Sequence, residues 1–205
     1  MIENKRLLKR GAESELYLID WYGYNAVSKT RVPKKYRHYA IDSTLRKQRT
    51  LHEANIMSSV KMFGVETPFI YFLNPDNFEI IMEYVVGSVL KDVFSSDLCY
   101  NLGRIVALLH FHNIIHGDIT TSNFILTPQK HLIIFDFGLS FFSERLEDKA
   151  ADIRLFKEIL NSVHVEYFEL SFENFLLGYS KIYGKKSLKI FDTVKEIEQR
   201  GRYSR

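Results

Sequence analysis

The apolar positions in the first part of the chain come in short stretches of strand length, separated by polar turns. Turn-forming residues gather at 20–25 and again at 74–77, and each group predicts a β-hairpin. The predicted strands cover Leu16–Ile19, Ala26–Val27, Ile70–Leu73 and Phe78–Tyr84.

Helical periodicity appears between these hairpins and dominates the later part of the chain. Apolar residues recur at helical spacing over 43–62, where Ser43 is the expected N-cap, and over 97–112. Further helices are predicted at 148–161 and across most of 166–199. Strands early and helices late favour an α+β fold with a β-rich first lobe.

The boundary between two lobes is expected near Gly87, where the strand pattern stops. Residues 1–86 would form a small N-terminal lobe, and residues 87–205 a reduced, mainly helical C-terminal lobe. The length of 205 residues and the 46% hydrophobic composition suit one such two-lobed domain with a substantial core. They exclude a largely disordered chain.

Composition also narrows the cellular setting. No apolar run approaches the roughly 18 residues that span a bilayer, and the charged N-terminal residues lack the hydrophobic region of a signal peptide. We therefore expect no membrane association. Cys99 is the single cysteine, which allows no internal disulfide. A reducing compartment follows as the expectation, either the cytoplasm, the nucleus or both.

The net charge is only +3, but the positive charge is concentrated. Residues 29–49 contain eight lysine or arginine residues and one acidic residue, Asp42. This stretch could bind RNA phosphates, or it could be a solvated helix face beside a partner-binding loop, and the sequence leaves both open. The basic tail, with Arg200, Arg202 and Arg205, could likewise reach a partner or RNA, or form a disordered end.

The segment richest in chemistry runs from the HGDITTSN sequence at 116–123 to the DFG sequence at 136–138. Two short apolar stretches around a polar turn predict a hairpin between them. Asn123 precedes the first strand and Asp136 follows the second, so the hairpin brings both side chains together. Asp118 lies on a loop that can fold back over them. Such oxygen ligands suit Mg²⁺ beside phosphate, and a further carboxylate suits a general base or hydroxyl-orienting group.

Two neighbouring residues are expected to be structural. His116 is predicted to pack beneath the loop, and Asp152 to cap its helix or to hold the loop backbone. The simpler hypothesis for the whole segment is a hairpin with polar ends and no chemistry. Six specified residues at fixed offsets disfavour it.

The order H-x-D-x-x-x-x-N followed by D-F-G resembles the catalytic and metal loops of protein kinases. The resemblance implies a two-lobed, kinase-like fold that binds ATP and Mg²⁺. It implies that Asp118 is the catalytic residue and that Asn123 and Asp136 hold the metal. Lys29, at the end of an AVSK sequence, would contact the α- and β-phosphates, and Glu53 would pair with it.

The adenine and phosphate contacts follow from the same resemblance. The IIMEYV sequence at 80–85 resembles a kinase hinge, so backbone groups of Glu83 and Val85 would meet adenine. A GAES sequence stands where kinases carry a glycine-rich loop. Gly11 and Ser14 would therefore lie at the phosphates, with fewer backbone contacts than usual.

The sequence also departs from an ordinary protein kinase. Gly117 replaces the catalytic-loop arginine that usually binds a phosphorylated activation loop, and Thr120 replaces a lysine that would meet the γ-phosphate. Only a short stretch separates Gly138 from the next predicted helix, and it carries no A-P-E sequence. The platform that docks peptide substrates is therefore expected to be missing.

These departures, together with six segments, closely resemble one family. The segments are RVPKKYRH (31–38), LRKQRTLHEA (45–54), HGDITTSN (116–123), DFGLS (136–140), EDKAADI (147–153) and RGR (200–202). The family is the small atypical kinase/ATPase of the KEOPS (EKC) complex, the PRPK family, and the resemblance covers residues 11–205. It implies an autophosphorylating serine/threonine kinase that acts as an Mg²⁺-dependent ATPase. It also implies a role in threonylcarbamoyl modification of adenosine 37 in tRNAs that read ANN codons.

The partners that this resemblance implies are a threonylcarbamoyl-transferase-type subunit and the other small KEOPS subunits, with tRNA reached through the complex. Two other classes stay open. A small-molecule phosphotransferase of the aminoglycoside- or choline-kinase type shares H-G-D-x-x-x-x-N, but it usually lacks the Phe-Gly after the metal-binding Asp. A non-catalytic ATP-binding scaffold would have to be inactive although five of the kinase residues are present, Lys29, Glu53, Asp118, Asn123 and Asp136.

Overall fold

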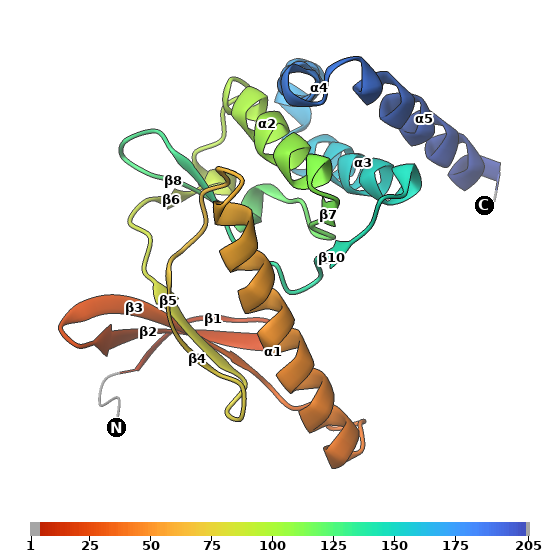
Figure 1. Cartoon of the computed structure of the whole chain (residues 1–205). Helices are drawn as coiled ribbons and strands as arrows, with labels where there is room; N and C mark the ends of the chain where they lie inside the picture. Colours follow the sequence, from red (N-terminus) through yellow and green to blue (C-terminus); the bar gives the residue numbers. More distant parts are fainter. Residues whose placement is uncertain (1–4, 204–205) are drawn as a thin grey trace.

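The structure, a computed structural model, describes residues 5–203 and the side chains of residues 5–200. Its first part is a five-stranded antiparallel sheet in the order β1-β2-β3-β5-β4. The strands are β1 (Arg6–Arg10), β2 (Ser14–Trp21), β3 (Tyr24–Arg31), β4 (Ile70–Asn74) and β5 (Glu79–Glu83). The long helix α1 (Tyr39–Lys61) runs beside this sheet toward the rest of the molecule (Figure 1).

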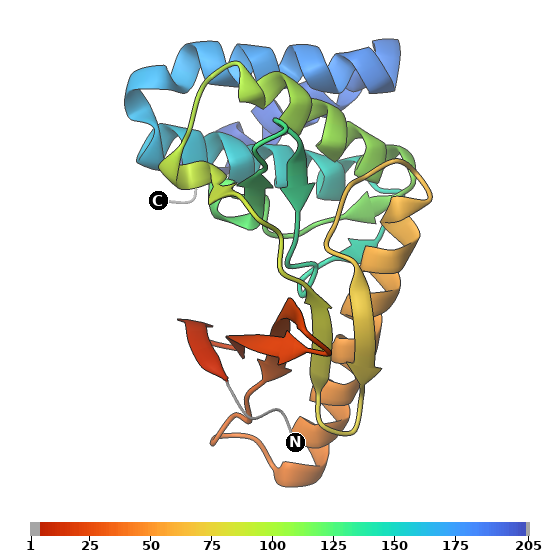
Figure 2. The same cartoon turned by 90° about the vertical axis from the view of Figure 1, so that its left-hand side faces the viewer.

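The second part is mainly helical. Its helices are α2 (Leu98–Phe111), α3 (Leu146–Val163), α4 (Phe168–Tyr183) and α5 (Ser187–Tyr203). Short strands form two small sheets, β6 (Ser88–Val89) with β8 (Phe124–Leu126) and β9 (Leu132–Ile134), and β7 (Ile114–Ile115) with β10 (Phe141–Phe142). Figures 1 and 2 show the large sheet on one side and α2–α5 on the other. The predicted α+β, kinase-like arrangement with a β-rich first part is confirmed.

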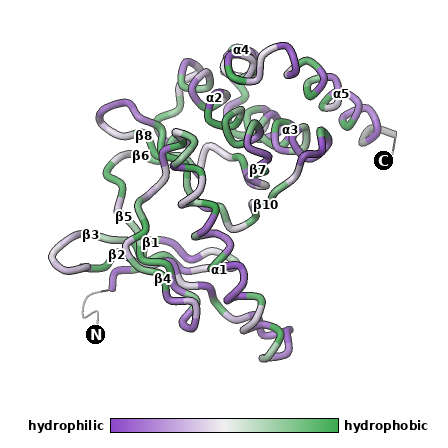
Figure 3. Tube along the Cα trace, viewed as in Figure 1, coloured by the Kyte–Doolittle hydropathy of each residue, from purple (hydrophilic) through white to green (hydrophobic). Residues whose placement is uncertain are grey.

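One hydrophobic core joins the two parts. Met57 of α1, Ile80 of β5, Val106 of α2 and Ile134 of β9 all belong to the same buried cluster. Hydrophilic positions gather instead at the tip of the β8–β9 hairpin and along α5 (Figure 3). The predicted lobe boundary at Gly87 falls in the connection between β5 and β6, where the chain passes from one part to the other.

The start of α1 differs from its prediction. The helix begins at Tyr39, so Ser43 is not its N-cap but follows the first turn, and its hydroxyl donates to the Ala40 carbonyl. Asp42 stabilises this earlier start because its buried carboxylate accepts from the backbone N–H of Lys34 and from Arg46 Nε. An acidic side chain in the first turn also complements the helix dipole.

The first strand, β1, was not predicted at all. All of its residues are exposed, and the RLLKR sequence has no alternation of buried and solvated positions. An edge strand with charges on both faces lacks the periodic signal on which strand prediction depends. The neighbouring hairpin was predicted correctly, and its turn is the residue pair Tyr22–Gly23, with φ of 53° and 85°.

Two glycines set how α4 crosses α2. A Cβ on Gly178 would lie 1.9 Å from the Tyr100 carbonyl oxygen, and one on Gly103 would lie 2.0 Å from that of Phe175. The two helix backbones therefore touch directly, which fixes α4 against the helix that precedes the catalytic loop. None of the helices in the described part of the chain is long and apolar enough to cross a membrane.

Candidate active site

The β8–β9 hairpin brings the predicted metal ligands together. Phe124 pairs with Ile134, and the N–H of Phe135 donates to the carbonyl of Asn123 at 3.1 Å. Asn123 therefore lies opposite Phe135, one residue from Asp136. The sequence predicts that Asn123 lies beside Asp136, and the structure places it opposite the preceding residue, Phe135.

Asn123 and Asp118 are locked to each other. The amide nitrogen of Asn123 donates to the backbone oxygen of Asp118 at 2.9 Å and to its carboxylate at 2.8 Å. The amide nitrogen thus faces Asp118, and the carbonyl oxygen of the same amide is directed elsewhere. The oriented amide oxygen of Asn123 and the carboxylate of Asp136 are a suitable ligand pair for Mg²⁺. This ion takes few protein oxygens and completes its coordination shell with phosphates and water.

Asp136 occupies an uncommon backbone conformation, with φ of 66°. Asp tolerates the left-handed region better than most residues, and strain of this kind gathers at functional sites. Its carboxylate oxygen Oδ1 lies 2.6 Å from Lys29 Nζ. Burial raises the pKa of Asp136, but the nearby cations Lys29 and Arg31 outweigh burial and bring that pKa below its usual value. Asp136 is therefore a carboxylate at neutral pH.

Lys29 connects this loop to α1. Its ammonium lies 2.5 Å from Glu53, in an ion pair whose partners are 6% and 1% exposed. Burial lowers the pKa of Lys29, yet the nearby carboxylates of Glu53 and Asp136 give a net increase. Glu53 also accepts from Arg31 Nη2 at 2.5 Å. The lysine–glutamate pair that the resemblance implies is present, and a second cation shares its carboxylate.

The backbone of the catalytic loop is held from below. Asp152, buried on α3, accepts from the N–H groups of His116 and Gly117 at 2.7 and 2.9 Å. Of its two predicted roles, holding the loop backbone is therefore the one observed. His116 is fully buried against Phe137, and burial lowers its pKa, so the ring packs as a neutral group. Its structural role is confirmed.

Gly117 stands where the kinase arginine is missing. Its φ is 79°, and a Cβ there would lie 2.6 Å from the backbone oxygen of Leu139. Any side chain would have to displace the segment that follows the DFG sequence. The backbone conformation of this loop therefore leaves no room for an arginine at position 117.

The predicted phosphate loop is a tight turn. The N–H of Gly11 donates to the carbonyl of Ser14 at 2.9 Å, and Ser14 begins β2. Glu13, between them, forms an ion pair with Arg49 at 2.8 Å. Sequence analysis missed the part that Glu13, Arg31 and Arg49 play here. The spacing of Arg31 two residues after Lys29 was the available signal, since it puts both on one face of β3.

The hinge residues lie at the end of β5. The N–H of Glu83 donates to the Phe69 carbonyl at 2.7 Å, and its carboxylate accepts from the Phe69 N–H at 3.0 Å. The backbone N–H of Glu83 is therefore occupied, so the predicted adenine contacts fall to its carbonyl and to the backbone of half-buried Val85. Contacts of these residues with adenine stay a prediction, as do the nucleotide contacts of Gly11 and Ser14.

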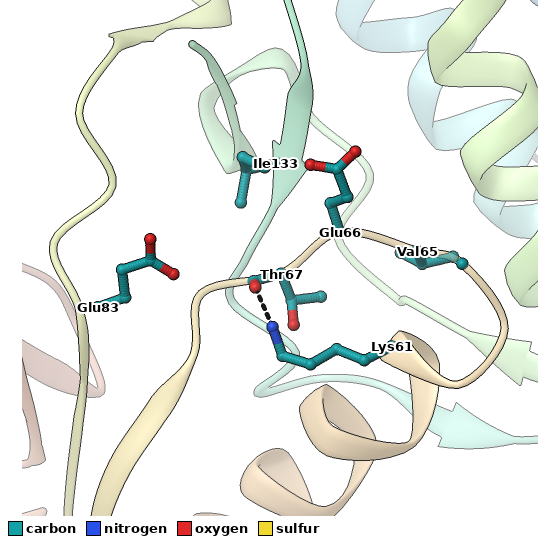
Figure 4. A pocket seen from close by; sticks show the side chains of 7 residues that line it. Lys61, Val65, Glu66, Thr67, Glu83 and Ile133 are labelled. Atoms are coloured by element: carbon teal, nitrogen blue, oxygen red, sulfur yellow. Dashed lines mark hydrogen bonds between the residues drawn. The ribbon is translucent and has the colours of Figure 1, made fainter.

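A cavity of about 340 Å³ lies where the α1–β4 connection faces the hinge strand and β9 (Figure 4). The Glu83 carboxylate lines it, with Lys61, Glu66, Thr67 and Ile133. Lys61 donates to the Thr67 carbonyl, and burial lowers its pKa despite the nearby glutamates. The predicted catalytic residue and metal ligands do not line this cavity.

The basic stretch 29–49 is largely paired within the protein. Its cations contact carboxylates of the chain in the pairs Lys29–Glu53, Arg31–Glu53, Arg37–Asp42, Arg46–Asp42, Lys47–Asp76 and Arg49–Glu13. Four of these pairs join α1 to the sheet or its loops, and all of them leave less positive charge for an external phosphate. The hypothesis of direct tRNA contact loses part of its basis. In the tail, residues 201–205 lie outside the side chains that the structure describes.

Comparison with known proteins fits this geometry. The family model of the protein kinase domain matches residues 10–157. A Pyrococcus abyssi protein named KEOPS complex subunit Bud32 is 39% identical over 212 residues, which cover 97% of this chain and 96% of that protein. The chain belongs to the Bud32 family of kinase-like proteins. Kinase domains use ATP, generally with Mg²⁺. Among the described residues, no three or more His, Cys, Asp or Glu side chains form a cluster that could hold a metal.

Longer relatives carry the same unit as part of a larger chain. A Methanobrevibacter smithii protein named "Probable bifunctional tRNA threonylcarbamoyladenosine biosynthesis protein" is 45% identical over 198 residues. A protein of the same name from Methanocaldococcus jannaschii is 39% identical over 201 residues. Each match covers 97% of this chain and 37% of the relative. The chain thus spans little more than a third of these two relatives.

Proposed function

We propose that this chain is the kinase-type subunit of a KEOPS complex and turns over Mg²⁺-bound ATP in support of threonylcarbamoyl modification of tRNA. The observation that carries the proposal is the contact of Lys29 with both Glu53 and Asp136, beside the locked pair of Asp118 and Asn123. A cation for the phosphates, two metal ligands and a carboxylate near the nucleophile are the parts that phosphoryl transfer needs. The names of the relatives supply the biological setting.

Each residue has a distinct task in this proposal. Lys29 positions the α- and β-phosphates, and Glu53 orients Lys29. The oxygens of Asn123 and Asp136 would hold Mg²⁺, which neutralises charge on the phosphates when it is bound. Asp118 orients the attacking hydroxyl or water and accepts its proton.

The features around the site favour water, a serine of the chain itself or a partner residue as the acceptor. Only seven residues, 139–145, separate the DFG sequence from α3. Phe141 and Phe142 of this segment pair with β7, so it is drawn against the C-terminal part. No extended platform for a peptide substrate is formed within the described residues. A serine/threonine kinase activity that acts on the chain itself therefore fits better than one that acts on free peptides.

The partners of the proposed subunit are a threonylcarbamoyl-transferase-type protein and other small subunits of the complex, through which tRNA is reached. The names of the longer relatives support a link to the tRNA modification itself. The proposed location is the cytoplasm, the nucleus or both.

The test follows the γ-phosphate of labelled ATP with Mg²⁺ present. The native chain is compared with Asp118→Asn, with and without the transferase-type partner and tRNA. The matched control is Asp192→Asn, which changes an exposed aspartate on α5. Release of label to water, or its transfer to serine of the chain, should be lost in Asp118→Asn and kept in Asp192→Asn.

Other outcomes would support other functions. Label on an added aminoglycoside or choline would indicate a small-molecule phosphotransferase. Nucleotide binding without turnover in any mixture would indicate a scaffold that uses ATP as a structural ligand.

A further inference from the structure

Charged side chains of alternating sign form a continuous chain through the first part of the molecule, which we call the ion-pair ladder. Its members, in order, are Arg49, Glu13, Arg31, Glu53, Lys29 and Asp136. The successive N–O distances are 2.8, 3.6, 2.5, 2.5 and 2.6 Å. Only the last two links belong to the lysine–glutamate–aspartate arrangement of the site already described.

The ladder joins segments that are separate in the sequence. Glu13 lies on the loop before β2, Arg31 ends β3, and Arg49 lies one helical turn before Glu53 on α1. The ladder thus connects the predicted phosphate loop, β3, α1 and the metal loop. Movement of any one of these segments would break an ion pair with another.

Arg31 is the centre of the ladder. It is 5% exposed, and its two terminal nitrogens point to different carboxylates, Nη2 to Glu53 and Nη1 to Glu13. A planar guanidinium can span two acceptors in this way, whereas a lysine ammonium is a single point charge. Arg31 Nε is buried without a hydrogen-bond partner, which is costly. The side chain is thus placed for its two carboxylates at the expense of its own remaining donor.

Backbone contacts reinforce the same connections. Lys34 Nζ donates to the carbonyl of Ala12 in the phosphate loop. Arg46 Nη1 donates to the carbonyl of Arg31 at 3.2 Å, and His52 Nε2 lies 2.8 Å from the Ser140 carbonyl just after the DFG sequence. Helix α1 is therefore bound to the sheet and to the metal loop through its middle part, from Arg46 to Glu53.

We propose that Glu13, Arg31 and Arg49 are positioning residues of the nucleotide site. They hold the 11–14 loop and α1 in the arrangement that presents Lys29 and Asp136 to the phosphates. The loop has Gly11 as its only glycine, and Gly117 leaves no arginine to bind a phosphorylated segment. In kinases with that arginine, binding of the phosphorylated segment helps to order the site. In this chain the ion-pair ladder holds the site in order without phosphorylation. This inference rests on the proposed binding of Mg²⁺–ATP at this site.

The consequence is a pre-ordered loop. A loop that must be ordered when nucleotide binds lowers affinity by the cost of ordering it, and a loop already fixed avoids that cost. Arg49 makes no predicted contact with nucleotide. Its removal should nevertheless weaken nucleotide binding, because Glu13 then loses its strongest anchor on α1.

The test measures the dissociation constant of Mg²⁺ with a non-hydrolysable ATP analogue by calorimetry, in the full chain. Arg49→Gln should raise this constant about fivefold, the size expected for a partly exposed ion pair. Lys47→Gln is the matched control, because it removes an exposed ion pair of the same helix that lies outside the ladder. It should leave the constant within about twofold.

Three further variants separate positioning from general stability. Glu13→Gln should raise the dissociation constant at least as much as Arg49→Gln, because it also removes the link to Arg31, and the double variant should bind no more weakly than Glu13→Gln alone. Arg49→Lys should recover most of the affinity, since a single nitrogen, Nη1, makes both hydrogen bonds to Glu13. With ATP itself, Arg49→Gln should raise KM more than it lowers kcat.

The results distinguish this inference from the proposed function. Equal dissociation constants for Arg49→Gln, Lys47→Gln and the native chain would overturn the ladder's role even if turnover is normal. Native binding without turnover would refute the proposed ATPase and leave the ladder to be judged on the binding constants. Failure of the native chain to bind the analogue at all would overturn both.

Discussion

The ammonium of Lys29 lies 2.6 Å from the carboxylate of Asp136, although 107 residues separate them in the chain. This contact joins β3, in the first part of the molecule, to the metal loop in the second part. It fixes the positions of both groups without nucleotide, and the charge of each group stabilises the ionised form of the other. The first two predictions remove one partner each.

Asp136→Ala should abolish the response of the protein to Mg²⁺ and ATP. A ligand that binds the native state raises the melting temperature by mass action, so Mg²⁺–ATP should stabilise the native chain and EDTA should remove most of that effect. The variant should show neither effect, and it should lose ATP turnover and tRNA modification together. Its own folding should change little, because the side chain is 42% exposed.

Retention of tRNA modification by Asp136→Ala would contradict the proposal that turnover is needed. Asp192→Asn, the α5 variant, is the control for both melting and turnover. It should behave as the native chain in every assay.

Lys29→Ala should fold but turn over ATP poorly. Arg31 still neutralises Glu53 in this variant, so no buried carboxylate is left without a cation. The phosphates lose their positioning charge, and kcat/KM should fall by about 10²-fold or more, as when one preorganised electrostatic contact is removed. Steady-state ATPase assays with the partner present measure this, with the exposed Lys195→Ala as control. Unchanged turnover would show that Lys29 does not contact the phosphates.

His164 should make stability depend on pH. Its ring stacks on Phe94 with centroids 3.7 Å apart, and Nε2 lies 3.0 Å from the hydroxyl of Thr121. Burial, with a smaller contribution from Lys91, lowers its pKa below 6.5. The unfolded chain therefore binds more protons below pH 6.5 than the folded chain does, and the free energy of unfolding should decrease as pH falls from 6.5 to the lower, folded-state pKa.

Urea denaturation at pH 7.5 and 5.5 measures this decrease. His164→Gln keeps a polar partner for Thr121 but does not titrate, so the difference in stability between the two pH values should be smaller in this variant. An unchanged difference would assign the pH dependence to other groups.

The sequence was informative where chemistry depends on spacing along the chain. Asp118, Asn123 and Asp136 are joined by one loop and one hairpin, so their offsets alone predict that they meet. Lys29 and Glu53 are joined by a strand and a helix, and only the resemblance to kinases paired them. Their contacts with one another are present in the structure, and their contacts with nucleotide remain to be measured.

Sequence was less informative about charges whose partners lie far along the chain. The stretch 29–49 suggested a basic surface because its charges were counted within the stretch alone. That count leaves out the carboxylates elsewhere in the chain that pair with it. Arg49 pairs with Glu13, 36 residues away, and Lys47 pairs with Asp76, 29 residues away. The helix start was misplaced because it is stabilised by the contacts of Asp42 with Lys34 and Arg46 rather than by a side-chain cap at Ser43.

Gly117→Ala should destabilise the catalytic loop through contact with Leu139 as well as through backbone strain. Gly64 is the matched control, because it has the same φ of 79° but open space where a Cβ would lie. The segment at Leu139 cannot easily give way, since the next residue, Ser140, bonds to Phe137 and to His52.

Gly64→Ala should therefore lower the free energy of unfolding by about 1 kcal/mol, the cost of an alanine in the left-handed conformation. Gly117→Ala should lower the free energy of unfolding by about 2–4 kcal/mol, because the clash with Leu139 adds to the backbone strain. It should also lose most of its ATP turnover, because the clash moves Asp118. Urea denaturation gives the two free energies, and their difference isolates the steric part. Equal losses in the two variants would show that the backbone at Leu139 can move aside, and that the missing arginine is not a consequence of the path of this loop.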